Sequence, residues 1–186
     1  MKKYEDMKIG IFCSASENID SIYFEETQKL GTWIGRNRHT IVYGGTSQGL
    51  MECIAKSVNE SGGDTIGIMP SFMYENGLAS SEANNIILTQ DMTERKERMM
   101  NEADIFIALP GGFGTYDEIF HIVACGQVGY HSKKVLLFNI NGFYDDLVRQ
   151  SEKCFNEKFT PIEYKSRLKA VYSIDECINE LLQLPI

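Results

Sequence analysis

Short apolar runs alternate with longer segments of helical periodicity along the chain, and this alternation limits the fold to few possibilities. The runs interpreted as strands are 7–13, 40–43, 65–69, 86–89, 105–109 and 134–139, with one more near 170–172. Several of them are apolar without interruption, as in a parallel sheet covered by helices on both faces. The sequence therefore predicts an α/β fold, a Rossmann-like doubly wound parallel sheet with helices on both faces.

The segments between the apolar runs supply the helices. The predicted helices are 23–34, a segment ending near Val58, one opened by Asp91, one from the 105–109 strand to about Val128, one from Phe143 to about Phe155, and a closing helix capped by Ser173. Residues 71–84 lack a clear period, and we expect a long surface loop there. With no repeat and no linker, residues 1–186 are predicted to form one domain.

Charge and cysteine usage argue against several classes of protein. The formal net charge of −8 disfavours a nucleic-acid polymer as partner, whereas a small anion remains possible. The start, MKKYEDMK, has no apolar segment behind its lysines, and no apolar run approaches the ~18 residues of a membrane helix. We therefore expect a cytoplasmic protein without a signal peptide or a membrane partner. Five scattered cysteines without a CxxC motif predict buried reduced thiols.

The three histidines show no spacing typical of a metal site. His121 lies three residues after Glu118 and can share its helix face, but one such pair is more often packing than ligation. We expect no catalytic metal and no cofactor.

A glycine-rich stretch, LPGGFGTYDE at 109–118, follows one predicted strand and opens a helix. Ligands of such folds bind beyond the carboxyl ends of the strands. Glycines let backbone N–H groups approach an anion, the helix dipole points the same way, and Thr115 can add a hydroxyl donor. The stretch is neither a GxGxxG dinucleotide fingerprint nor a P-loop.

A second cluster, YGGTSQG at 43–49, also follows a strand. Two glycine-rich loops at one crevice favour a nucleotide, with separate contacts to its phosphate and its sugar. A glycine turn needed only for tight strand–helix packing is the alternative for the 109–118 stretch.

Glu118 lies three residues after Thr115, so both side chains project from one face of the first helical turns. A carboxylate beside a phosphate is electrostatically unfavourable, and this indicates a separate task. It can face the sugar, where positive charge develops when a glycosidic bond breaks. Arg95 and Lys96 are nearby cation candidates. A solvated helix face is the alternative for these charged residues.

Two motifs together resemble the signatures of a known family. PGGFGTYDE matches the pattern PGGxGTxxE, and MTERK at 92–96 matches MxxRK. Both are signatures of the LOG ("Lonely Guy") family of cytokinin riboside 5′-monophosphate phosphoribohydrolases, whose members are often labelled lysine decarboxylases. The resemblance extends over nearly the whole chain, through FCSAS at 12–16, YGGTSQGLM at 43–51 and GFYDDL at 142–147.

The resemblance implies a Rossmann-like homodimer that hydrolyses the N-glycosidic bond of a nucleoside 5′-monophosphate to a free base and ribose 5-phosphate. It implies that Arg95 and Glu118 are the catalytic pair. The positions implied to bind substrate or phosphate are Gly111, Gly112, Gly114, Thr115, Lys96, Met92, Ser14, Ser16, Gly44 and Gly45. No cofactor is implied, and nothing in the sequence requires pyridoxal phosphate.

Departures from the family pattern leave undetermined which base of the nucleotide is recognised. Thr46 stands where a third glycine is common, Gly77 where plant-type members carry a substrate-binding glutamate, and Ala124 where a threonine is found. AMP or an N6-modified AMP of the cytokinin-activation type is expected, with a pyrimidine monophosphate such as CMP as an alternative. A non-hydrolytic carrier of a nucleotide or of molybdenum cofactor is the alternative of another class. The retained Arg95 and Glu118 favour the enzyme.

The helix after the glycine motif is apolar on more than one face. Its apolar residues are Ile119, Phe120, Ile122, Val123, Ala124 and Val128. A helix that packs on a sheet needs one apolar stripe, so the surplus suggests a second buried surface, as in the homodimer that the resemblance implies. Burial under the C-terminal helix is the competing explanation.

Overall fold

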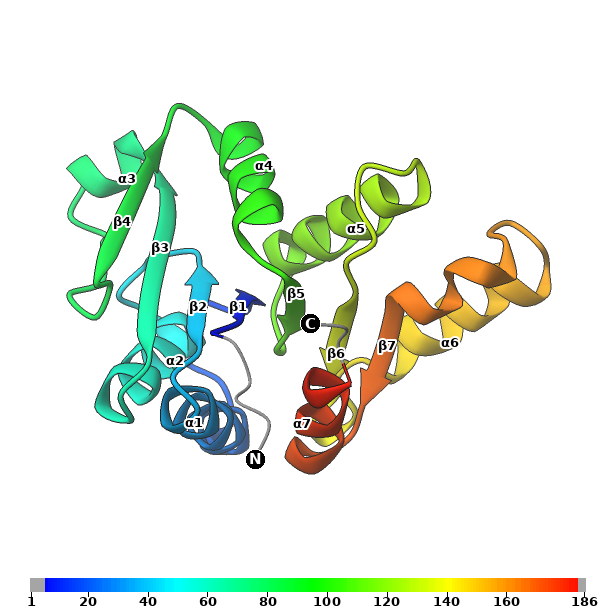
Figure 1. The fold of residues 1–186 in the computed structure, drawn as a ribbon, viewed down its shortest axis with the longest axis horizontal. Coiled ribbons are helices and arrows are strands. Elements are labelled where there is room, and N and C mark those ends of the chain that lie inside the picture. Colours follow the sequence, from blue (N-terminus) through cyan, green and yellow to red (C-terminus); the bar gives the residue numbers. More distant parts are fainter. Residues whose placement is uncertain (1–5, 184–186) are drawn as a thin grey trace.

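A computed structural model describes residues 6–183, and all of its strands belong to one parallel sheet (Figure 1). The strand order is β4-β3-β2-β1-β5-β6-β7. The strands are β1 (Lys8–Phe12), β2 (Thr40–Tyr43), β3 (Asp64–Pro70), β4 (Asn85–Thr89), β5 (Ile105–Ala108), β6 (Val135–Phe138) and β7 (Leu168–Val171). Each predicted apolar run contributes a strand, and the predicted parallel α/β fold is confirmed.

The helices follow the predicted order. They are α1 (Ser21–Arg36), α2 (Gly49–Glu60), α3 (Ser71–Glu75), α4 (Met92–Glu102), α5 (Phe113–Gln127), α6 (Asp145–Asn156) and α7 (Ile174–Leu182), with 3-10 turns η1 (Ile140–Gly142) and η2 (Ile162–Arg167). Asp91 opens α4 by accepting from the N–H groups of Thr93 and Glu94 at 2.8 and 2.9 Å. The predicted cap at Ser173 also forms, because its hydroxyl accepts from the Glu176 N–H.

Helices cover both faces of the sheet (Figure 1). One face packs against α1, α2 and α7, whose buried residues Leu30, Ile54 and Leu181 join one apolar cluster. The opposite face packs against α4 and α5, where Met99 and Ile119 join a second cluster. Because α7 and α5 lie on opposite faces, burial under the C-terminal helix does not explain the apolar surplus of α5, and that explanation is wrong.

The segment 71–84 is more ordered than the predicted loop. It begins with the one-turn helix α3, and Ala79 forms an antiparallel bridge with Thr46. The Ser80 N–H donates to the Gly45 carbonyl at 2.8 Å. A five-residue helix is too short to show a period, and a bridge to a distant loop leaves no local pattern, so the prediction of an irregular loop is wrong in part.

The order of the strands changes direction between β1 and β5. β1 pairs with β2 on one side and with β5 on the other, both in parallel. The loops that follow β1 and β5 therefore leave neighbouring strand ends in opposite directions, and such a switch point opens a crevice for ligands. The glycine-rich stretch at 109–118 begins here.

The described residues also bear on two further predictions, the absence of a membrane helix and the burial of the cysteines. No helix among residues 6–183 is both long and apolar enough to cross a membrane. The five cysteines are free thiols. Cys13 and Cys177 are buried as predicted, whereas the other three are half-buried.

Candidate functional site

Arg95 and Glu118 form a buried ion pair between α4 and α5. Nη1 of Arg95 donates to Oε1 of Glu118 at 2.5 Å, and the two side chains are 6% and 7% exposed. Nε of Arg95 donates to the Ile68 carbonyl near the end of β3 at 2.9 Å. The two residues implied to be catalytic therefore lie in direct contact at the carboxyl ends of the strands. Neither is the solvated helix residue of the alternative interpretation.

Gly44 leaves room for the guanidinium of Arg95. A Cβ at Gly44 would lie 2.6 Å from Nη2 of Arg95 and 2.8 Å from the sulfur of Met51. Gly45 has a different reason: its φ of 76° is left-handed, and a Cβ would lie 3.1 Å from the backbone of Gly67 in β3. Both glycines thus have a role within the chain, and contact with substrate stays a prediction for them.

Burial dominates the electrostatics of Glu118. Removal from water raises the pKa of its carboxyl above the ordinary value, and the neighbouring Arg95 offsets part of this effect. Burial likewise raises the pKa of the Cys13 thiol, to which the charge of Glu118 adds. The carboxylate is thus held in a site of low polarity with Arg95 as its hydrogen-bonded partner, and there an electrostatic interaction is stronger than in water.

The glycines of the 109–118 stretch differ in what surrounds them. A Cβ at Gly111 would collide with the side chain of Thr115, so this glycine is required by packing. A Cβ at Gly112 or Gly114 would meet nothing within 4 Å, and neither residue has a left-handed φ. Nothing within the described chain therefore requires these two exposed glycines.

The N-terminus of α5 is open. Gly112 occupies the cap position, and no side chain accepts a hydrogen bond there. The first N–H groups of a helix have no partner within the helix, and they carry the positive end of its dipole. The start of α5 therefore offers free donors beside two glycines with empty space, which is the arrangement that binds an anion.

The predicted serines lie in the loop after β1. The Ser14 N–H donates to the Pro110 carbonyl at 3.2 Å, and the Ser14 carbonyl accepts from the Leu50 N–H at 3.0 Å. The Ser14 hydroxyl accepts from the Ser16 N–H at 2.9 Å. Ser14 therefore joins the loops after β1 and β5 to the start of α2, while Ser16 stays exposed. Thr115 is buried against Gly111.

Lys96 and Met92 lie on the same helix as Arg95 but are more exposed than it. Nζ of Lys96 contacts both carboxylate oxygens of Asp117, at 3.0 and 2.9 Å. Met92, the first residue of α4, is 44% exposed. The structure thus gives Lys96 a protein partner that the sequence analysis did not name. A signal was available, since consecutive basic residues at 95–96 match consecutive acids at 117–118.

Tyr144 is a second contributor that the sequence analysis did not single out. Its buried hydroxyl donates to the carbonyl of Leu109, the first residue of the glycine-rich stretch, at 2.7 Å. Burial raises its pKa, so the hydroxyl stays protonated and remains a donor. Tyr144 lies in the matched motif at 142–147, but nothing in that motif indicates which loop it supports.

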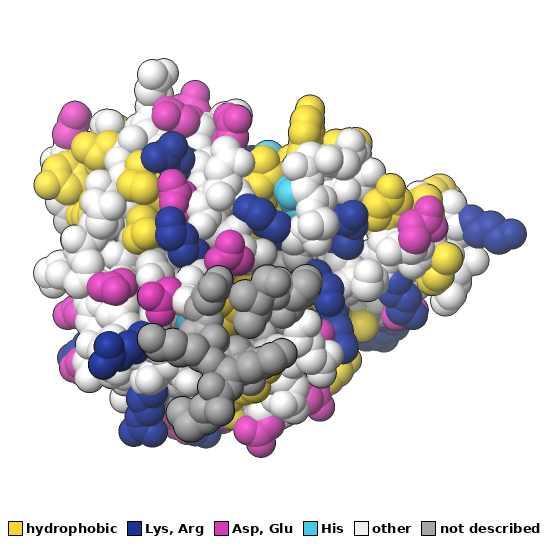
Figure 2. All heavy atoms as spheres, viewed as in Figure 1, with side chains coloured by type: hydrophobic (Ala, Val, Ile, Leu, Met, Phe, Trp, Pro, Cys, Tyr) yellow, Lys and Arg dark blue, Asp and Glu magenta, His cyan; other side chains and the backbone are white. Residues whose placement is uncertain are grey.

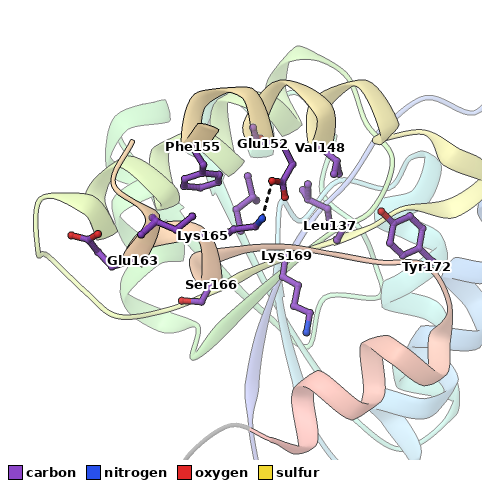
Figure 3. Close-up of a pocket in the computed structure, with 13 residues that line it drawn as sticks. Leu137, Val148, Glu152, Phe155, Glu163, Lys165, Ser166, Lys169 and Tyr172 are labelled. Carbon is purple, nitrogen blue, oxygen red and sulfur yellow. Dashed lines mark hydrogen bonds and ion pairs between the residues drawn. The ribbon is translucent and has the colours of Figure 1, made fainter. Parts of the chain in front are cut away.

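A separate cavity of about 570 Å³ lies between α6, η2 and β7 (Figure 3). An ion pair of Lys165 and Glu152, at 2.8 Å, spans it. None of the predicted site residues lines it. Among residues 6–183, no cluster of three or more histidine, cysteine or acidic side chains could hold a metal ion.

Comparison with known proteins places this chain in a family. The family described as "Possible lysine decarboxylase" matches residues 51–181. The chain is 34% identical over 152 residues to the cytokinin riboside 5′-monophosphate phosphoribohydrolase LOG5 of Arabidopsis thaliana, covering 82% of this chain and 67% of that protein. It is also 34% identical over 181 residues to LOG3 of the same plant, covering 97% and 84%. The chain belongs to the LOG family.

The LOG family is a family of hydrolases that act on N-glycosyl bonds, and this chain is a member of it. A solved structure supports the fold alone. The molybdenum cofactor binding protein of Rippkaea orientalis superposes with a TM-score of 0.73 at 23% identity, covering 96% of each chain.

Proposed function

We propose that the protein is a nucleoside 5′-monophosphate phosphoribohydrolase that acts on AMP or an N6-modified AMP. The observation that carries the proposal is the buried Arg95–Glu118 pair, which lies at the strand ends where the open N-terminus of α5 begins. The names of the plant relatives support the reaction type and the substrate class of this proposal.

The phosphate is assigned to the start of α5. Gly112 and Gly114 leave the backbone N–H groups of the first helical turn accessible, and the helix dipole favours a negative group there. Glu118 lies one turn further along the same helix. A phosphate at the helix start therefore directs the sugar, and not the phosphate, toward the carboxylate.

Glu118 acts on the sugar. The C1′–N bond breaks as positive charge develops on the ribose, and a carboxylate that is already oriented stabilises this charge. Oε1 of Glu118 is held by Arg95, while no hydrogen bond from another described residue reaches Oε2. Water supplies a hydroxyl group to C1′ and a proton to the departing base, which yields ribose 5-phosphate and the free base.

The active unit is proposed to be a homodimer. Phe113, Phe120 and Val128 are 92%, 48% and 73% exposed, and with Ala124 they form a stripe along one side of α5. Apolar side chains also gather at the surface around α5 in Figure 2. A second copy that covers this stripe would wall the site, because the stripe starts inside the glycine motif.

The test is to incubate the purified protein with AMP, an N6-modified AMP and CMP, and to measure free base by chromatography. Free base from AMP or its N6-modified form is expected. A Glu118→Gln variant should release little base. Glu152→Gln is its matched control and should release base at the wild-type rate, since Glu152 is a remote carboxylate in an exposed ion pair. Nucleotide binding without release of base would contradict the proposal and favour the carrier function, and release from CMP alone would move the substrate class to pyrimidines.

A further inference from the structure

Two consecutive ion pairs connect α4 to α5. Arg95 pairs with Glu118 in the interior, and Lys96 pairs with Asp117 next to it. The second pair is more accessible: the Asp117 side chain is 57% exposed and that of Lys96 is 19% exposed. Both cations come from one turn of α4, and both anions come from one turn of α5.

Lys96 also lies close to Glu118. Lys96 and Glu118 border the same narrow gap, which is too small for a water molecule, together with Phe12, Met99, His121 and Ile122. Lys96 therefore has two carboxylates within its range, and in this structure its ammonium contacts both oxygens of Asp117 and neither of Glu118. Asp117 is therefore the carboxylate that holds Lys96 in this structure.

The choice matters for the reaction. A second cation on Oε2 would occupy the free oxygen of Glu118 and neutralise the charge that faces the sugar. In a buried site this effect is large, since the Coulomb energy between close charges grows as the local dielectric constant falls. A reaction that uses the charge of Glu118 is therefore favoured when the Lys96 ammonium binds another partner.

We propose that Asp117 is a positioning residue that holds the Lys96 ammonium away from the Glu118 carboxylate. This inference rests on the proposed function. It differs from a purely structural tie between α4 and α5, because an exposed ion pair contributes only about 0–1 kcal/mol to stability. Loss of Asp117 should then affect turnover much more than folding.

Other titratable groups around Glu118 also affect the pH dependence of the activity. The titratable or charged groups that face it are Arg95 and Lys96 on α4, Asp117 and His121 on α5, Cys13 after β1, and Tyr144 before α6. Burial raises the pKa of Cys13 and Tyr144 and lowers that of His121, so all three are neutral near pH 7. Cys13 and Tyr144 gain no proton on the acid side, whereas His121 does, so the acid limb of a pH profile reports on Glu118 and His121.

The test compares Asp117→Asn with Asp146→Asn, a control that removes an exposed carboxylate paired with Arg149 on α6. Asp117→Asn should lower kcat roughly tenfold, less than the ~100-fold expected from loss of a whole preorganised group, with an unchanged melting temperature. The acid limb of its pH profile should move to lower pH, because an ammonium on Glu118 lowers the pKa of that carboxyl. In the double variant Lys96→Met/Asp117→Asn, kcat should recover and KM should rise, because the positive charge of Lys96 is lost.

A wild-type kcat in Asp117→Asn, or no recovery in the double variant, would overturn the inference. A crystal structure of Asp117→Asn tests it without activity. The Lys96 ammonium should lie within about 3.2 Å of the Glu118 carboxylate, and an ammonium that stays away from it would also overturn the inference. Failure of the proposed function is a separate result, in which the wild-type protein releases no base from any nucleotide.

Discussion

Gly114→Ala should make the protein more stable and less active. Gly114 is the second residue of α5, it is exposed, and an added Cβ meets nothing within 4 Å. Alanine is favoured over glycine in a helix by up to about 1 kcal/mol. For a chain of this size, 1 kcal/mol corresponds to roughly 2–4 °C in melting temperature, so an increase of that order is the upper bound.

The same methyl group would occupy the space assigned to the phosphate. An extra methylene in a filled site costs about 1–3 kcal/mol. That cost corresponds to roughly 5- to 150-fold weaker binding. The loss should appear in kcat/KM for AMP and in the inhibition constants of inorganic phosphate and ribose 5-phosphate.

The assay pairs thermal unfolding with steady-state kinetics on the same preparation. Gly111→Ala is the contrasting variant, because its Cβ would collide with Thr115 and should lower the melting temperature. A Gly114→Ala protein with unchanged kcat/KM and unchanged inhibition by phosphate would refute the phosphate assignment. A lower melting temperature would show instead that the glycine serves the fold.

Four further outcomes are expected. Glu118→Gln should reduce kcat at least about 100-fold, while calorimetry should still detect binding of ribose 5-phosphate to the variant. Near-normal turnover would contradict a catalytic role of Glu118. Gly44→Ala should displace the Arg95 guanidinium and lower kcat. It should also lower the free energy of unfolding, measured by urea titration, by about 1–3 kcal/mol. A fully active variant would contradict the packing argument. Because burial raises the pKa of Glu118 and the ionised form is the active one, kcat/KM should fall as pH drops through a value above 4.5; a limb at or below 4.5 would conflict with this. Phe120→Asp should convert a dimer to a monomer in sedimentation at micromolar concentration, and a wild-type monomer of full activity would exclude the shared site.

The sequence determined the elements and the chemistry of the loops. Uninterrupted apolar runs predicted the buried parallel strands, because a strand covered on both faces has no polar side. The sequence also predicted the anion site and its carboxylate, at Gly111, Gly112, Gly114 and Glu118. Helix starts that bind anions need small residues, and a carboxylate can stabilise the positive charge that develops on a sugar. These features depend on residues close together in the chain, so a local pattern records them.

Only the tertiary structure decided how those parts meet. The strand order places the loop after β1 beside the loop after β5, although Phe12 and Ala108 at the two strand ends are 96 residues apart, and no local pattern encodes such a pairing. The fold buries Arg95 against Glu118 and gives Lys96 to Asp117, a distribution of partners that depends on how α4 and α5 pack. It also shows that packing requires a glycine at position 111 but not at position 114. The sequence does not reveal this difference, because the space around each glycine depends on how the chain folds around it.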